Sequence, residues 1–260
     1  MRGSRLPRRF LPLFNVATAS GGLIVTLHAA RLAAPDTLQL EWLRAMAFVP
    51  ARLWRFVAPD AAAARLAAAA RSSPEAGQAA AFWLGEGLAP WSALTYAGVH
   101  VDWLHALTNA AMIAAFGAPV ARRLSPRGFL GLLALGALCG AAAQASALDA
   151  AFAPLVGASA CVSALIGALA RLWTEPEPVR LTPLREAARR PPSLAAFAAG
   201  VLAMLGGAAL GDEVAAIGWR AHLAGFVCGF VLIGALARRR KADGARSCRS
   251  QRTEASLDSD

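Results

Sequence analysis

Long uncharged segments, rather than amphipathic repeats, dominate the pattern of hydrophobic and polar positions along the chain. Six stretches contain no Asp, Glu, Lys or Arg: residues 10–30, 103–121, 128–148, 150–170, 191–211 and 221–237. Five of them are about 19 to 21 residues long, close to the ~20 residues that a helix needs to cross a bilayer. The last has about 17, but Trp219 and the basic residues from Arg238 onward can anchor its two ends at the membrane interfaces. The pattern predicts six membrane-spanning helices.

The composition favours the same fold class. Hydrophobic residues make up 57% of the chain, the mean hydropathy is +0.47, and the apolar residues come in runs. We therefore expect an all-α integral membrane protein with a basic N-terminus at 1–9, a membrane domain at 10–240 and a disordered tail at 241–260. Pro, Gly and interfacial residues refine the predicted spans to about 10–30, 103–121, 128–148, 155–172, 192–211 and 219–237.

Lys and Arg gather on one side of the predicted spans, as they do in cytoplasmic loops. They lie at the N-terminus, in the second-to-third and fourth-to-fifth connections and in the tail, whereas the connections at Asp149 and at Asp212 and Glu213 are acidic apart from Arg220. Both termini should therefore be cytoplasmic. The net charge of +10 follows from this asymmetry, so it gives little support to nucleic-acid binding.

The same topology places the long connection at residues 31–102 outside. It holds six Arg and six acidic residues and no uncharged stretch of 20 residues. The part from Leu40 to Phe56 is partly apolar and is broken by Pro50, which suits a structure lying in the membrane interface. Ala61 to Ala81 is rich in alanine, which favours helix but indicates no function.

Ser159 is a candidate nucleophile. Pro154 and Gly157 precede it and predict a late start for the fourth helix, which would put its hydroxyl near the first turn. There the first backbone N–H groups lack partners within the helix, and the positive end of the helix dipole favours an oxyanion, so the backbone of Ser159 could belong to an oxyanion hole. The alternative is an N-cap serine or a small residue that allows close helix packing.

His222 is the candidate general base, at the start of the sixth span. Gly229 falls on nearly the same helical face and Gly225 lies beside it, so another helix could come close there. If that neighbour is the fourth helix, Ser159 and His222 form a nucleophile and base pair at similar depth, on the external side. The alternative is a histidine that simply lies near a membrane interface.

A third group of polar residues enters the second span from the same side. His105 and Asn109 are four residues apart, so a helix presents them on one face, where both can donate hydrogen bonds to an oxyanion. The alternative for Asn109 is a hydrogen bond between helices.

Metal and aspartyl chemistry fit the sequence poorly. His100 and His105 are five apart, and the chain has no His-Glu-x-x-His pattern, so we expect neither a metal nor another cofactor. An aspartyl mechanism needs two carboxylates in one site, and none of the six uncharged segments offers one. The chain does not show the cysteine pattern of a disulfide framework, because three cysteines lie within spans and Cys248 lies in the tail.

In order, spacing and depth, these residues resemble the rhomboid family of intramembrane serine proteases. The family's His-x4-His-x3-Asn pattern on the second helix is matched by His100, His105 and Asn109. Its Gly-x-Ser motif on the fourth helix is matched by Gly157 and Ser159.

The resemblance extends to the sixth helix and to the external loop. The family's Ala-His-x-x-Gly-x-x-x-Gly pattern is matched by Ala221, His222, Gly225 and Gly229. Phe48 to Leu53 also looks like the Val-Pro-Ala-Arg stretch common in the first external loop of the family. Singly these patterns are weak, but jointly they are specific.

The resemblance implies a six-helix bundle with a Ser159–His222 dyad in a cavity open to the external side. We expect the membrane to be a bacterial inner membrane. His105, Asn109 and the Ser159 amide would hold the oxyanion, and His100, Gly157, Gly225 and Gly229 would support the site. The substrates would be membrane proteins, cut in or next to transmembrane segments where small or helix-breaking residues ease unwinding. The fifth helix would be the substrate gate.

Two features depart from the family pattern. Ala160 stands where the family usually has Gly, and its methyl group could tighten the contact beside the nucleophile. The connection from Glu175 to Pro192 is long and rich in proline.

Two other functions compete with that of a serine endopeptidase. A catalytically silent rhomboid-like protein would bind transmembrane helices, but it would not need Ser159, His222, Asn109 and His105 together. A transporter or channel would place ionisable residues or broken helices at mid-depth, which the uncharged spans do not support.

Overall fold

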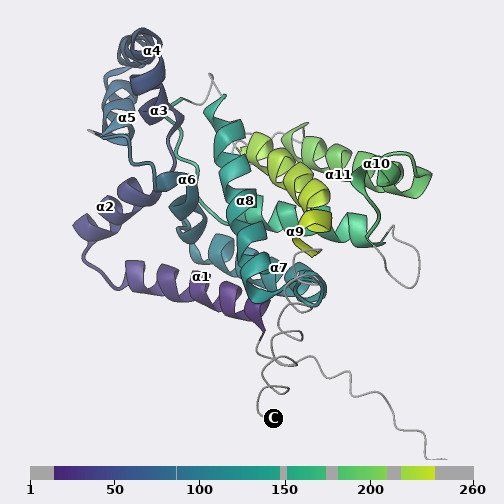
Figure 1. Ribbon diagram of the computed structural model, residues 1–260. Coiled ribbons are helices and arrows are strands. Elements are labelled where there is room, and N and C mark those ends of the chain that lie inside the picture. The colour runs from purple at the N-terminus through teal and green to yellow at the C-terminus, as the bar shows by residue number, and fades with distance from the viewer. Residues whose placement is uncertain (1–14, 86, 147–150, 174–180, 210–217, 238–260) are drawn as a thin grey trace, which may run out of the picture.

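The computed structural model describes residues 15–85, 87–146, 151–173, 181–209 and 218–237, and their regular structure is helical (Figure 1). Among these residues the one β-type pairing is an isolated antiparallel bridge between Phe48 and Leu155. The prediction of an all-α protein is confirmed for the part of the chain that is described. The predicted N-terminal extension and tail, the acidic turns at Asp149 and at Asp212 and Glu213, and part of the 175–192 connection lie outside the described residues.

Three of the described helices are long and apolar enough to cross a membrane: α7 (Trp103–Ala121), α8 (Pro126–Ala145) and the C-terminal helix (Gly218–Ala237). Three further apolar helices are shorter: α1 (Val16–Leu32), α9 (Ser159–Trp173) and the Pro191–Leu202 part of α11 (Pro191–Ala209). All six coincide with the predicted spans, but by length and composition only three qualify, so the count of six spans stays a prediction.

The helix α1 begins at a complete capping box. The Asn15 side chain accepts hydrogen bonds from the backbone of Ala17 and Thr18, and the Thr18 hydroxyl in turn accepts one from the Asn15 backbone. The helix then packs closely on α7, because a Cβ atom on Gly21 would lie only 2.8 Å from the carbonyl oxygen of Ala110. The missing side chain thus lets α1 approach the backbone of α7.

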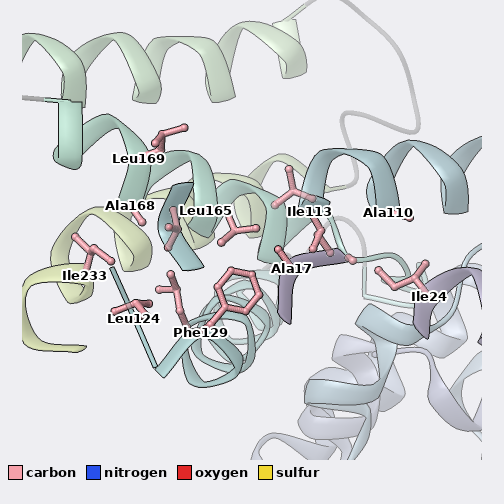
Figure 2. Close-up of a cluster of buried hydrophobic side chains, with 14 of the residues drawn as sticks. Ala17, Ile24, Ala110, Ile113, Leu124, Phe129, Leu165, Ala168, Leu169 and Ile233 are labelled. Atoms are coloured by element: carbon pink, nitrogen blue, oxygen red, sulfur yellow. The ribbon is translucent and has the colours of Figure 1, made fainter. Parts of the chain in front are cut away.

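The helix α9 lies at the centre of the bundle and packs against α7, α8 and α11. Ten of its 15 residues share an apolar or small side chain that is buried, which is the pattern of a helix surrounded by protein. Figure 2 shows the main cluster of buried side chains, to which α1, α7, α8, α9 and the C-terminal helix contribute: Ala17, Ile24, Ala110, Ile113, Phe129, Leu165, Ala168, Leu169 and Ile233.

Between α1 and α7 the chain forms a series of short helices. They are α2 (Asp36–Met46), α3 (Pro50–Val57), α4 (Pro59–Ser72), α5 (Pro74–Leu84), α6 (Ser92–Thr95) and the 3-10 turn η1 (Tyr96–Gly98). Proline occupies the first position of α3, α4 and α5, where its fixed φ suits a helix start and its missing N–H is not needed. Pro50 therefore starts a helix as well as interrupting the segment, and the predicted Ala-rich helix is two helices, α4 and α5.

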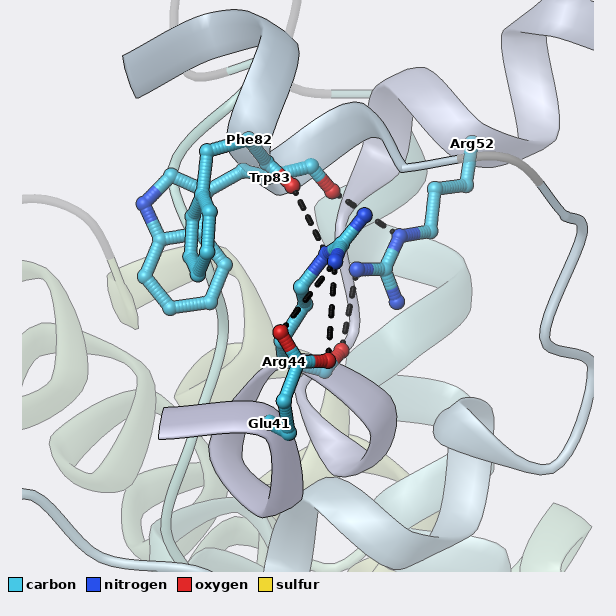
Figure 3. Close-up of polar contacts among 5 residues, drawn as sticks. All are labelled: Glu41, Arg44, Arg52, Phe82 and Trp83. Carbon is cyan, nitrogen blue, oxygen red and sulfur yellow. Dashed lines mark hydrogen bonds and ion pairs between the residues drawn. The ribbon is translucent and has the colours of Figure 1, made fainter. Parts of the chain in front are cut away.

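Two arginines bind the carboxyl end of α5 (Figure 3). Arg44 Nε donates to the carbonyl of Phe82 at 3.1 Å, and Arg52 Nε donates to that of Trp83 at 2.9 Å. The last carbonyls of a helix lack intrahelical partners and carry partial negative charge, so guanidinium groups stabilise them. Arg52 also donates to the carbonyls of Arg44 and Ala47, which ties α2 and α3 to α5.

Replacing Arg52 by alanine should destabilise this part of the protein. The side chain is 5% exposed, so its loss leaves three carbonyls without their donor and should cost about 2 to 4 kcal/mol. The matched control is Arg55→Ala, since Arg55 makes one exposed hydrogen bond, to Gly85, and should cost about 0.5 to 1 kcal/mol. Thermal unfolding of both variants in detergent measures the difference, and equal losses would contradict the assigned role.

Candidate active site

Ser159 is the first residue of α9, and the segment before it is tied to the connection between α1 and α7. Phe48 and Leu155 exchange backbone hydrogen bonds of 3.1 and 2.8 Å, and Gly157 N–H donates to the carbonyl of Tyr96 at 2.9 Å. The serine therefore lies at the junction of a turn with a helix start, with the turn held from outside α9. Its side chain is partly exposed.

Gly157 is required in this turn for two reasons. Its φ of +100° lies in a region that residues with a Cβ rarely adopt. In addition, a Cβ atom at this position would lie 2.6 Å from the ring of His105. The Gly of the Gly-x-Ser motif thus allows both the conformation of the turn and the close approach of an imidazole.

Ser159 and His222 are in direct contact. The Oγ atom of Ser159 lies 2.8 Å from Nε2 of His222, which comes from the first turns of the C-terminal helix. With the ring proton on Nδ1, Nε2 can accept the hydrogen bond from the serine hydroxyl, and this is the tautomer that a general base needs. The arrangement provides a hydroxyl with a base in position to remove its proton.

The glycines of the C-terminal helix create this contact. A Cβ atom on Gly225 would collide with the carbonyl oxygen of Ala160, and one on Gly229 with that of Ala164. The two helices therefore meet through their backbones, as small residues permit in membrane proteins. This close approach brings His222 to the start of α9.

Ala160 directs its methyl group toward α8. It is 1% exposed, and a Cβ atom on Gly140 would lie 2.8 Å from the Cβ of Ala160 and 2.7 Å from the hydroxyl of Tyr96. That hydroxyl donates to the carbonyl of Ala137 on α8. The bare Gly140 thus makes room for the methyl group that departs from the family pattern.

Asn109 and His105 lie on one face of α7, one turn apart. The Asn109 amide is 5% exposed and donates one N–H to the carbonyl of His105 at 2.9 Å, so one of its two donors is used within its own helix. Asp102 caps the helix by accepting from His105 N–H at 2.8 Å. The ring of His105 lies beside Gly157 and 4.9 Å from that of His100.

His100 contacts the turn before the serine. Its Nε2 accepts a hydrogen bond of 3.3 Å from the backbone N–H of Ala158, and the ring is fully buried. The pKa of His100 is lowered to about 3, mainly by burial and also by the nearby His105, His28 and Arg31, so the ring is neutral at neutral pH. A neutral ring is what an acceptor at Nε2 requires.

Sequence reasoning missed two residues of α1, His28 and Arg31. His28 is 1% exposed, with its ring 4.8 Å from Trp103 and 6.5 Å from His100. The four histidines of the chain thus form one group around the site, although one comes from a helix that no motif covers. A histidine within the first uncharged segment was a signal that could have drawn attention to it.

A separate apolar groove of about 630 Å³ lies between α8 and the C-terminal helix. Its lining includes Cys139, Leu223, Val227 and Val231, and neither Ser159 nor His222 belongs to it. Among the described residues, no group of three or more His, Cys, Asp or Glu is placed to hold a metal ion.

The family comparison covers the site. The Rhomboid domain model matches residues 88–239, which is more than half of the chain and includes all the motif residues of α7, α9 and the C-terminal helix. The chain belongs to the rhomboid family. A search of curated proteins found no match. The helices α1–α5 precede the matched region, so the match does not cover His28 and Arg31.

The stability of the protein should fall at mildly acidic pH, in part because of His100. The unfolded chain binds a proton at this residue below about pH 6.5, whereas the folded protein resists protonation down to about pH 3. The contribution of His100 is therefore full above pH 6.5 and is lost as the pH falls, by about 1 kcal/mol at pH 5.5. His100→Gln keeps an acceptor but does not titrate, so its thermal midpoint should fall less between pH 7.5 and 5.5 than that of the wild type. Equal slopes would contradict the prediction.

Gly225→Ala should separate Ser159 from His222, because the added methyl collides with the carbonyl of Ala160. We expect labelling of Ser159 by a fluorophosphonate to slow by about 10-fold or more, since small misplacements of reacting groups are costly. Gly131→Ala on α8 is the control, because a Cβ there meets nothing within 4 Å. Unchanged labelling of the Gly225 variant would rule out the role given to this helix contact.

Proposed function

We propose that this rhomboid-family protein is an intramembrane serine endopeptidase that works through a dyad of Ser159 and His222. The observation that carries the proposal is the 2.8 Å contact between Ser159 Oγ and His222 Nε2 at the start of a buried helix. Membership of a family whose members are usually serine proteases supports the same reading.

In the proposed reaction, His222 removes the proton of Ser159 as the hydroxyl attacks the scissile carbonyl, and later gives it to the leaving amine. Water then releases the acyl group with the same histidine as base. We assign the backbone N–H of Ser159, at the first position of α9, as a donor to the oxyanion, because the first N–H groups of a helix lack intrahelical partners. We assign the second N–H of Asn109 and the ring of His105 as further donors.

The proposed topology has six spans, with both termini in the cytoplasm and residues 31–102 outside the cell. The helices α7, α9 and the C-terminal helix all have their first turns at the site, so they run in the same direction. Basic residues lie at their other ends: Arg122 and Arg123 follow α7, Arg171 lies in the last turn of α9, and Arg238 follows the C-terminal helix. This distribution favours the opposite, cytoplasmic side for those ends. The site would then open toward the external face of a bacterial inner membrane.

The proposed substrates are membrane proteins, cut in or next to a transmembrane segment. A helical backbone must unwind before its peptide bond can reach Ser159, and small or helix-breaking residues lower that cost. We assign α11 as the gate, because its Phe197 packs against two aromatic residues of the C-terminal helix. The centroid of the Phe197 ring lies 5.9 Å from that of Phe226 and 5.0 Å from that of Phe230. Neither a metal nor a cofactor is part of the proposal.

One observation favours a second candidate, a silent family member that binds transmembrane helices. Ala160 replaces the glycine that usually follows the serine in the family, and the family match alone fits both candidates equally. The methyl group of Ala160, however, lies on the face of α9 that packs against Gly140 of α8, and this supports the catalytically active candidate.

The test is cleavage of a transmembrane reporter by the full chain in liposomes. We expect the wild type to cut and the Ser159→Ala and His222→Ala variants to lose at least ~10³-fold in rate, because each removes half of the dyad. Ser163→Ala is the matched control, since Ser163 lies one turn further along α9 and is 4% exposed. Undiminished cleavage by the Ser159 variant would overturn the proposal, and an inactive wild type whose serine resists fluorophosphonate would favour the silent candidate.

A further inference from the structure

Arg31, at the end of α1, is a buried cation that contacts the segment just before α7. It is 6% exposed, and its Nη2 donates to the carbonyl of His100 at 3.0 Å and to that of Val101 at 3.4 Å. Among the described residues no carboxylate forms an ion pair with it. Burying a cation without a counter-ion is unfavourable, so packing of α1 alone does not account for an arginine here.

The carbonyl that Arg31 holds belongs to the residue that supports the serine turn. The His100 ring is fully buried, and its Nε2 accepts from the N–H of Ala158, which directly precedes Ser159. Two hydrogen bonds joined through His100 therefore link the Arg31 guanidinium to the amide of Ala158, one at the carbonyl of His100 and one at its ring. We call this link the hydrogen-bond chain. Without His100, that amide would lie buried without this acceptor, since Ala158 is 1% exposed.

His28, one turn earlier on α1, packs against the same loop. Its ring is nearly perpendicular to those of Trp103 and His100, with centroids 4.8 and 6.5 Å away. The helix α1 thus contacts both the backbone and the ring side of His100. Both contacts come from residues that precede the matched rhomboid region at 88–239.

We propose that Arg31 is a positioning residue for the nucleophile, acting through His100 on the turn at 157–159. Arg31 holds the backbone of His100 so that the ring meets the Ala158 amide, and this fixes the turn that presents Ser159 Oγ to His222. The inference rests on the proposed function for its catalytic consequence, but the hydrogen-bond chain itself can be tested without activity.

The first experiment measures the turn directly by hydrogen–deuterium exchange of the full chain in detergent, followed on peptides that contain residues 155–162. Arg31→Gln should raise exchange in these peptides, and Arg31→Lys, which keeps a donor and the charge, should restore part of the protection. Ile24→Ala is the matched control, because Ile24 is a buried α1 residue that packs in the main hydrophobic cluster and forms no part of the hydrogen-bond chain. If Arg31→Gln raises exchange no more than Ile24→Ala does, the proposal is wrong.

The second experiment measures the rate of fluorophosphonate labelling of Ser159. We expect Arg31→Gln to slow labelling by about 10-fold, with Arg31→Lys intermediate and Ile24→Ala close to wild type. In a double-mutant cycle, Arg31→Gln should add little to the loss of labelling rate caused by His100→Ala, because both substitutions break the same hydrogen-bond chain. Additive losses, or wild-type labelling of Arg31→Gln, would overturn the proposal. An unlabelled wild type would instead count against the proposed function, and the exchange experiment would then decide the role of Arg31.

Discussion

The contact of two helix backbones at the centre of the bundle is the constraint on which the site depends. Gly225 and Gly229 bring the C-terminal helix onto the carbonyls of Ala160 and Ala164, with no side chain between them. In a bilayer, apolar side chains gain little by leaving lipid for protein, so helix association relies on such close packing. The distance between the hydroxyl of Ser159 and the imidazole of His222 therefore depends on this contact.

Much of the arrangement could be predicted from the sequence because the bilayer simplifies it. A helix surrounded by lipid or by apolar protein is uncharged over most of its length, so the uncharged runs located α7, α8 and the C-terminal helix within a few residues. Pro154 and Gly157 indicated that α9 starts late, and it begins at Ser159. The short motifs then identified which helix ends carry reactive side chains, although they say nothing of the distances between those side chains.

The parts that could not be predicted are contacts between distant residues in the irregular connections. The sequence around Arg31 does not indicate its hydrogen bond to the carbonyl of His100. The sequence around Ala160 likewise does not indicate that its methyl group packs against Gly140. The Phe48–Leu155 bridge joins a predicted interface segment to the nucleophile turn, and its two residues belong to no shared pattern. Such pairings depend on the tertiary fold, whereas helix spans and caps depend on local sequence.

The turn before Ser159 is held by partners from widely separated parts of the chain: Phe48, Tyr96 and His100 precede it, and His222 follows it by 63 residues. Contacts of such long sequence separation form late, because closing each loop costs entropy before the contact repays it. A chain still being inserted already holds the partners of the turn, but it carries the serine without its base, because His222 comes later in the sequence. The pair that we propose for catalysis is therefore assembled only after the helix at Gly218–Ala237 has joined the bundle.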